Sequence, residues 1–288
     1  MSAERRLGLL LLLGATLAWS TAGLFARAIT LDTPTVIMWR GWAGAMGLAV
    51  LLALTRGRAG LADFARLGRA GRVYALSSGL GMLFFVGALK STSIAHVAII
   101  YATLPFVAAG LGWLILREAP GTGALVAAVV ALAGSAIMVG LGHEGGLAGD
   151  LMSFGMVLTM AALILISRAR PALPALAAGI VSALLAAAVC LPFATTEGLT
   201  LRELSLTAAF GLVNSSLAFA LFIFGARRVS PVETALMGAL EVPVTPLWVW
   251  LVFDEMPGPA TLAGGALVLA AVVGHILWSA RRGESRGP

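Results

Sequence analysis

Long apolar segments follow one another along almost the whole chain, separated by short stretches that carry charge, proline or glycine. A run of about 20 apolar residues is long enough to cross a bilayer as a helix. The pattern therefore predicts an all-α membrane protein with ten transmembrane helices. We expect these helices at residues 7–28, 34–54, 73–89, 94–116, 121–141, 147–167, 171–193, 204–226, 231–253 and 258–280.

The first apolar segment shares two features with a secretory signal peptide, because Arg5 and Arg6 precede it and small residues follow its centre. The hydrophobic region of a signal peptide spans roughly 7–15 residues. The segment at residues 7–28 is longer than that, so we interpret it as a first transmembrane helix that is kept.

Composition supports a lipid environment. Hydrophobic residues make up 60% of the chain and charged residues only 11%, whereas a soluble domain carries roughly 25% charged residues. The single cysteine, Cys190, lies in an apolar stretch and allows neither a disulfide nor a cysteine-based metal cluster. We expect no cofactor and no metal, lipid as the surrounding partner, and a monomer.

The basic residues lie in short predicted loops rather than on one folded face, which argues against a nucleic-acid partner. Cytoplasmic loops of membrane proteins carry an excess of Lys and Arg. With ten helices, 15 of the 19 Lys and Arg residues fall on the side of the N-terminus, and only Arg27, Lys90 and Arg202 fall on the other. This bias predicts that both termini are cytoplasmic, since one helix more or fewer would scramble it.

Two similar junctions indicate an internal repeat. Residues 118–121 read Glu-Ala-Pro-Gly and residues 255–258 read Glu-Met-Pro-Gly, and each precedes a segment rich in Gly and Ala. Upstream, Pro105 and Pro243 occupy matching places in the fourth and ninth predicted helices. The chain therefore divides into two expected units of five helices each.

The expected units are residues 1–143 and 144–288. Because five is an odd number, the second unit must enter the membrane in the opposite orientation to the first. Inverted repeats of this kind place a binding site near the midplane and allow alternating access. A small solute is the partner that such an architecture implies.

Several short motifs, in this order and spacing, carry a resemblance over nearly the whole chain. They are Trp19-Ser20, Pro34, Trp39-Arg40 and the two Glu-x-Pro-Gly junctions at 118–121 and 255–258. In these the sequence resembles the drug/metabolite transporter superfamily, specifically its EamA-type ten-helix carriers. The second half has no counterpart of Arg40, so a role of that residue is not symmetric.

The resemblance implies a transporter that exports metabolites or drugs. The sequence as a whole is similar to bacterial aromatic amino-acid exporters. This resemblance implies a location in a bacterial inner membrane, and it implies amino acids, aromatic or otherwise neutral, as solutes. The alternative is a multidrug or other metabolite exporter of the same fold.

Ionisable side chains at membrane depth are costly, so each is a candidate for function. Glu241 falls halfway along the ninth predicted helix, on one face with Glu233, Met237 and Trp248. Lipid would not tolerate that face, so we expect it to line a cavity or another helix. Two readings stay open: Glu241 contacts a cationic group or takes up a proton, or it is a neutral or paired structural residue.

Four other ionisable residues lie at membrane depth or at a predicted helix end. Arg40 is suited to bind a substrate carboxylate, to pair with Glu241 or to reach the outer interface; His96 suits a gate, a proton-linked step or an interfacial hydrogen bond. Glu233, at a predicted helix start, is expected to be structural. His275 has no polar companion near it in sequence, and we expect it to be structural too.

Polar and aromatic residues on the other predicted helices complete the candidate site. Each has a plain alternative, which is helix bridging or core packing. Besides the ionisable residues, the candidates are Trp19, Ser78, Tyr101, Met156, Asn214, Met237 and Trp248.

Other functions find little support in the residues. The sequence contains no P-loop, no HExxH, no GxSxG and no pair of intramembrane aspartates, so neither ATP coupling nor an intramembrane enzyme is indicated. A channel is disfavoured because inverted repeats with proline-interrupted helices are typical of carriers.

Overall fold

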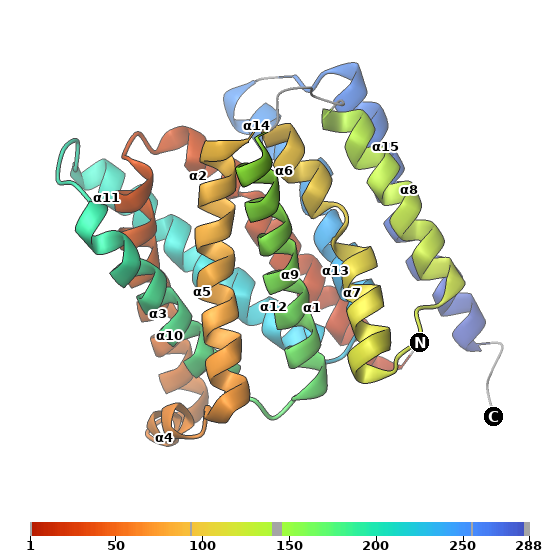
Figure 1. Ribbon diagram of the computed structural model, residues 1–288, viewed down its shortest axis with the longest axis horizontal. Coiled ribbons are helices and arrows are strands. Elements are labelled where there is room, and N and C mark those ends of the chain that lie inside the picture. The colour runs from red at the N-terminus through yellow and green to blue at the C-terminus, as the bar shows by residue number, and fades with distance from the viewer. Residues whose placement is uncertain (1, 93, 140–145, 255, 285–288) are drawn as a thin grey trace.

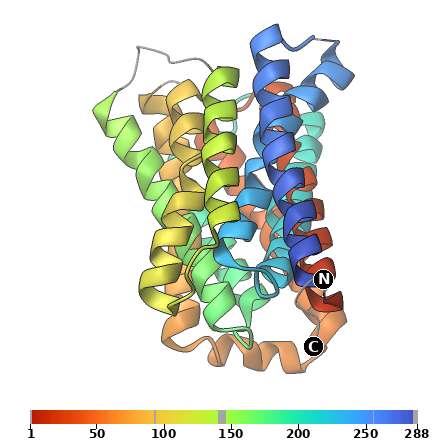
Figure 2. The ribbon, with the colours of Figure 1, turned by 90° about the vertical axis from the view of Figure 1, so that its right-hand side faces the viewer.

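The computed structural model describes residues 2–92, 94–139, 146–254 and 256–284. Every regular element within these residues is helical, as the hydrophobic pattern predicts. Figures 1 and 2 show the helices running along one common direction as a bundle, with α1 beginning and α15 ending at its lower end. The α9 helix, in contrast, begins at the upper end, so the two halves of the chain start from opposite ends.

Eight helices within the described residues are long and apolar enough to cross a membrane, by length and composition alone. The α5 helix (Gly68–Ser91) and the apolar α8 helix (Thr122–Val139) occupy the two remaining predicted ranges. The eight candidate spans are Ala3–Phe25, Thr33–Arg56, Ile99–Leu116, Leu147–Ala169, Ala175–Phe193, Leu201–Ala226, Pro231–Phe253 and Pro259–Ser279.

Side-chain caps explain where several helices begin. Ser2 accepts a hydrogen bond from the backbone N–H of Arg5 at the start of α1 (Ala3–Ser20). Asp32 accepts one from Thr35 N at the start of α3 (Thr33–Arg56). Such caps satisfy N–H groups that the first helical turn leaves unpaired.

The first predicted helix divides at Thr21 into α1 and α2 (Ala22–Ala28), and two further predicted helices are interrupted by proline. In the first half, α6 (Ile94–Tyr101) ends four residues before Pro105 and α7 (Leu104–Leu111) follows. In the second half, α13 (Pro231–Ala239) ends four residues before Pro243 and α14 (Glu241–Phe253) follows. Proline lacks the N–H that would bond to the carbonyl four residues earlier, and its ring clashes with that carbonyl.

Other boundaries also differ from the prediction. The α10 helix (Ala175–Cys190) begins later than expected because residues 171–174 form a turn that contains two prolines. The loop expected between the second and third helices contains a short helix, α4 (Ala59–Ala65). An ion pair of 3.2 Å between Arg56 and Asp63 holds α4 against the end of α3.

The packing of the helices reflects two repeats. The α9 helix (Leu147–Ala169) packs on α5 as α12 (Phe219–Ala226) packs on α1, and the π-helical segment η3 (Gly211–Ala218) packs on α3 as α10 packs on α5. The pairs α3–α10 and α8–α15 (Pro259–Glu284) join counterparts directly. These pairs of packed helices stay the same when each helix is exchanged for its counterpart in the other repeat.

One interface breaks this equivalence. The α13 helix packs against α7, α8 and α9 of the first repeat, at the lower half of the bundle. Its counterpart α6 forms no comparable contact with α14, α15 or α1 among the described residues. The two interrupted segments therefore meet through their lower halves only, along what we call the α7–α13 seam.

Small residues on α3 allow close helix crossings. A Cβ on Gly41 would lie 2.8 Å from the carbonyl oxygen of Ala183 in α10. A Cβ on Gly44 would lie 2.5 Å from the Cβ of Ser215 in η3. Any larger residue at these positions would push the helices apart.

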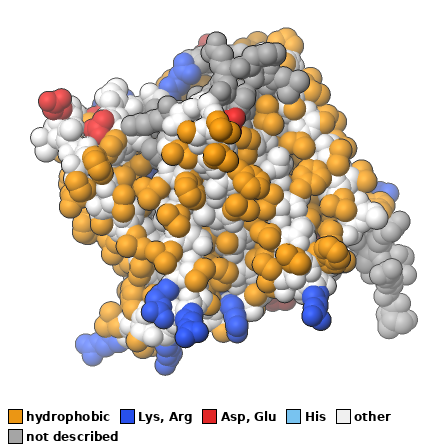
Figure 3. All heavy atoms as spheres, in the orientation of Figure 1, with side chains coloured by type: hydrophobic (Ala, Val, Ile, Leu, Met, Phe, Trp, Pro, Cys, Tyr) orange, Lys and Arg blue, Asp and Glu red, His pale blue; other side chains and the backbone are white. Residues whose placement is uncertain are grey.

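Figure 3 shows hydrophobic side chains over the middle of one face of the bundle and Lys and Arg side chains gathered along its lower edge. Large apolar side chains stay exposed on the outside, including Leu10 at 66% and Leu114 at 73%. Such a surface suits lipid rather than water.

Candidate functional site

A small central cavity lies between the two repeats. Its volume is about 10 Å³, close to the minimum that holds one water molecule. The walls come from α1, α6, α7, α9, α12 and α13, so both interrupted segments contribute. Its lining residues are Leu12, Ala15, Thr16, Trp19, Tyr101, Leu104, Met160, Ile164, Phe222, Thr234, Ala235 and Gly238.

Glu241 is the first residue of α14, directly after the interruption at Leu240. Its carboxylate has no hydrogen-bond or ion-pair partner among the described residues, although its backbone carbonyl accepts a bond of 2.8 Å from Thr245 Oγ1. Tyr101 lies near enough to Glu241 for an electrostatic interaction, and its hydroxyl faces Gly238. A half-buried carboxylate without a partner is costly in an apolar interior.

The polar face expected along residues 231–253 does not form one continuous stripe, because the interruption at Leu240 divides it. Thr234 lines the central cavity, and the backbone carbonyl of Met237 accepts a hydrogen bond of 3.1 Å from Thr16. Glu233 instead lines a second pocket, at the lower end.

Three candidate residues gather around α1 through hydrogen bonds that bridge helices. The first is Trp19, whose Nε1 donates to the backbone carbonyl of Asn214 at 3.0 Å. Asn214 Nδ2 donates to Thr21 at 3.2 Å. In the same way, Trp248 Nε1 donates to Ser20 Oγ at 2.8 Å. Trp19 also lines the cavity, so it serves both the wall and the bridge.

Arg40 stands apart from this cluster. Its guanidinium lies over the ring of Phe210, 4.3 Å from the centroid, and Nε donates to Ser215 Oγ at 3.1 Å. Another guanidinium nitrogen lies 3.6 Å from Met82 Sδ. Within the described part of the chain it pairs with no carboxylate, so the alternative of an Arg40–Glu241 pair is not realised in this structure.

The remaining candidates are not brought into the central cavity. Met156 is buried in a core cluster with Ala88 and Val97, so core packing accounts for it. Ser78 is half-buried on α5 and lines neither described cavity. His96 belongs to α6, but its side chain lies outside the described residues.

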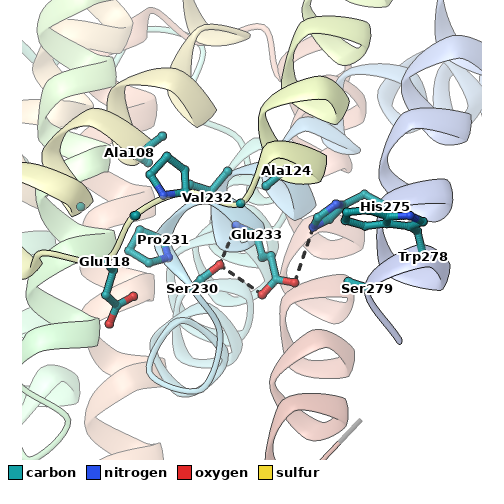
Figure 4. A pocket seen from close by; sticks show the side chains of 15 residues that line it. Ala108, Glu118, Ala124, Ser230, Pro231, Val232, Glu233, His275, Trp278 and Ser279 are labelled. Atoms are coloured by element: carbon teal, nitrogen blue, oxygen red, sulfur yellow. Dashed lines mark hydrogen bonds and ion pairs between the residues drawn. The ribbon is translucent and has the colours of Figure 1, made fainter. Parts of the chain in front are cut away.

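A larger pocket of 290 Å³ lies at the lower end of the bundle, between α7, α13 and the α8–α15 pair (Figure 4). We call it the lower pocket. Small apolar residues form most of its wall, with polar side chains at the start of α13 and near the end of α15. Its lining residues are Ala108, Ala109, Gly112, Glu118, Ala119, Pro120, Gly121, Ala124, Ser230, Pro231, Val232, Glu233, His275, Trp278 and Ser279.

Glu233 is held by two side chains, those of Ser230 and Arg5. Ser230 Oγ donates to the carboxylate at 3.1 Å and, as the N-cap of α13, accepts from the backbone N–H of Glu233 at 3.3 Å. Arg5 donates to the same carboxylate and, at 2.7 Å, to Ser279. These contacts support the expected structural role of Glu233.

His275 has no polar companion near it in sequence, but it approaches Glu233 in the folded bundle. Its Nε2 lies 3.6 Å from Glu233 Oε1, beyond a hydrogen-bond distance. Figure 4 shows the imidazole pointing toward Glu233 across the pocket. The pairing escaped sequence reasoning because α13 and α15 meet only in the folded bundle. The pattern Ser230-x-x-Glu233 does carry a readable capping signal.

The described residues contain no group of three or more His, Cys, Asp or Glu that could hold a metal ion. The site thus consists of hydrogen-bonding, aromatic and carboxylate side chains. Such groups bind an organic solute by charge, stacking and hydrogen bonds.

Comparison with known proteins identifies the fold. One similar solved structure, a crystal structure of a protein, superposes with a TM-score of 0.82 and 19% sequence identity over 94% of this chain and 98% of that chain. No curated protein matches the chain. The model of the EamA-like transporter family matches residues 6–140 and again residues 147–277. The chain therefore belongs to the EamA-like transporter family.

Proposed function

We propose that this protein exports small metabolites, most of all aromatic or other neutral amino acids, by alternating access around its central cavity. Family membership makes it a membrane transporter of small metabolites. The solute class and the outward direction follow from the resemblance to bacterial aromatic amino-acid exporters. The bacterial inner membrane is the proposed location.

One observation carries the proposal: both interrupted segments line the central cavity, and a carboxylate without a partner among the described residues follows one of the interruptions. Glu241 follows the break at Leu240, and Tyr101 ends the helix before the other break. Interrupted helices of inverted repeats are where many transporters bind their solutes. The ammonium group of an amino acid would give the Glu241 carboxylate a positively charged partner.

The aromatic and cationic candidates fit the same solute. Trp19 and Tyr101 line the cavity and offer flat faces to an aromatic or apolar side chain. Arg40, which has no carboxylate partner in the described residues, is suited to the carboxylate of the solute. The cavity has to widen before a solute enters, which alternating access provides.

The proposal includes a topology. We infer ten membrane crossings in two units, residues 1–143 and 144–288, with both termini cytoplasmic and a monomer as the working form. The gathering of Lys and Arg side chains at the end where α1 begins and α15 ends supports this orientation.

Counterflow in proteoliposomes tests the function. Purified protein is reconstituted with unlabelled amino acid inside, and uptake of the radiolabelled amino acid is followed at equal and unequal pH. Saturable counterflow is expected, and a change of rate with the pH difference would couple protons to transport. Absence of flux for every amino acid would overturn the amino-acid assignment and favour a drug or other metabolite as the solute.

A further inference from the structure

We propose that the lower pocket is a separate binding site for a small zwitterionic solute, an α-amino acid, on its way to the central cavity. This inference rests on the proposed transport function and adds a second position to the route. It follows from where the pocket lies, from its charge balance and from its free hydrogen-bonding groups.

The lower pocket and the central cavity lie in line along the α7–α13 seam. Ala108 of α7 lines the lower pocket and Leu104, one helical turn away, lines the central cavity. On α13, Val232 lines the lower pocket and Ala235 the central cavity. One turn of helix rises about 5.4 Å, so opening this seam would join the two spaces.

The charges that line the lower pocket are balanced. Glu118 pairs with Arg168 at 3.2 Å, and Glu233 pairs with Arg5. A solute with a net charge would add a buried charge without a partner, which is costly. A zwitterion adds one charge of each sign and keeps the balance.

The pocket also offers both kinds of hydrogen-bonding group. The side chain of His275 is only 8% exposed, and within the described residues neither ring nitrogen has a hydrogen-bond partner. A neutral imidazole presents one donor and one acceptor. The imidazole therefore suits a solute that carries both acceptor and donor groups.

The start of α8 adds donors for a carboxylate. Leu125 N donates to the carbonyl of Gly121 at 3.2 Å, which makes Gly121 the N-cap residue. Ala124 N donates to the same carbonyl at 3.0 Å, so the N–H groups without a partner inside the helix are those of Thr122 and Gly123. Glycine at the N-cap has no side chain to accept from them. The residues on either side of this pair, Gly121 and Ala124, both line the pocket.

The volume and the walls agree with this ligand. A space of 290 Å³ is at the lower end of the range for small-molecule sites. Trp278 and Val232 provide apolar surface for the side chain of an amino acid. Carboxylates, imidazole and the α8 N-terminus surround its polar end.

Cysteine protection tests the site. Ala119, exposed and lining the pocket, is changed in Ala119→Cys, and Ala59, exposed on α4 at the same end, is changed in Ala59→Cys as the control. Cys190 is the single native cysteine and is buried, so the unchanged chain serves as the blank. Labelling by a maleimide is followed with and without L-tryptophan, tryptamine or indole-3-propionate.

We expect L-tryptophan to slow the labelling of Ala119→Cys at least fivefold and to leave that of Ala59→Cys unchanged. Tryptamine and indole-3-propionate, which carry one charge each, should protect much less. His275→Leu in the Ala119→Cys background should abolish protection. Glu241→Gln in the same background should retain it, since Glu241 does not line the lower pocket.

Opposite results overturn the inference. Protection that is lost with Glu241→Gln but kept with His275→Leu would come from the central cavity. Absence of protection in a protein that still shows counterflow would refute the lower site and leave the transport function standing. Protection by phosphatidylethanolamine vesicles, but not by the amino acid, would assign the pocket to a lipid headgroup instead.

Discussion

Gly134 of α8 and Gly264 of α15 face each other at the crossing of their helices. A Cβ added to Gly134 would lie 2.7 Å from the carbonyl oxygen of Gly264, and a Cβ on Gly264 would likewise meet the carbonyl of Gly134. The two backbones are thus in direct contact, a type of crossing that small residues allow in membranes.

Gly264→Ala should destabilise the protein by about 1–3 kcal/mol, the usual cost of overpacking a tight interface. Gly274→Ala, on the same helix with nothing within 4 Å of the added Cβ, is the control. It should be neutral or stabilising by up to about 1 kcal/mol, because alanine favours helix more than glycine does. Unfolding free energies in mixed micelles measure both, and equal stability of the two variants would contradict the contact.

Glu241→Gln should reduce counterflow at least tenfold while leaving insertion and folding intact, because the amide cannot neutralise an ammonium group or take up a proton. The measurement is counterflow at matched protein content. Glu197→Gln, which changes an exposed carboxylate in a loop, should transport normally. Near-normal flux in Glu241→Gln would make Glu241 a structural residue.

Arg40→Lys should weaken binding of carboxylate-bearing solutes by about tenfold, since an ammonium group neither stacks on Phe210 as a guanidinium does nor binds a carboxylate in two-point fashion. Competition by L-tryptophan and by tryptamine separates the effects, because only the first carries a carboxylate. Arg202→Lys, at an exposed position, is the matched control. An unchanged affinity for tryptophan would remove Arg40 from the binding site.

Asp32 should make the stability depend on pH in the acid range. Burial alone would raise the pKa of Asp32, but hydrogen bonds from Thr35 and Thr195 outweigh it and lower that pKa. The carboxylate therefore stabilises the fold fully above its unfolded-state pKa, near 4, and this effect is lost as the pH falls through the lower folded-state pKa.

Melting curves from pH 6 to pH 3 test this. Asp32→Ala should lose about 0.5–2 kcal/mol at pH 6, the usual value of a helix cap. Asp32→Asn keeps a capping oxygen and cannot titrate, so its stability should fall less than that of the unchanged protein on acidification. Identical acid profiles for both would refute the assignment.

The hydrophobic pattern was sufficient to locate the eight candidate spans, because length and apolar content decide where a chain can cross lipid. The α14 end at Phe253 and the α13 start at Pro231 coincide with the predicted range. The interruptions at Pro105 and Pro243 carry a local signal, and so does the cap at Ser230. These features could be predicted because each depends on residues that are close together in the sequence.

Contacts between distant segments could not be read from the sequence. Arg5 and Glu233 are 228 positions apart, and their pairing depends on how α1 and α13 approach in the bundle. Trp248, a candidate for the solute site, donates to Ser20 of α1. Face periodicity predicted that such residues point inward, but only the crossing of the helices decides which partner they meet.

The α7–α13 seam closes one end of the bundle only, and its counterpart between α6 and α14 is not formed to a comparable extent among the described residues. In the proposed cycle, the α7–α13 seam would open as a second seam forms between α6 and α14, the other halves of the same two interrupted segments. Apolar area released at one end would be buried again at the other, so the two states would differ little in free energy. A solute that binds one of them better by about 1.4 kcal/mol then shifts the balance tenfold.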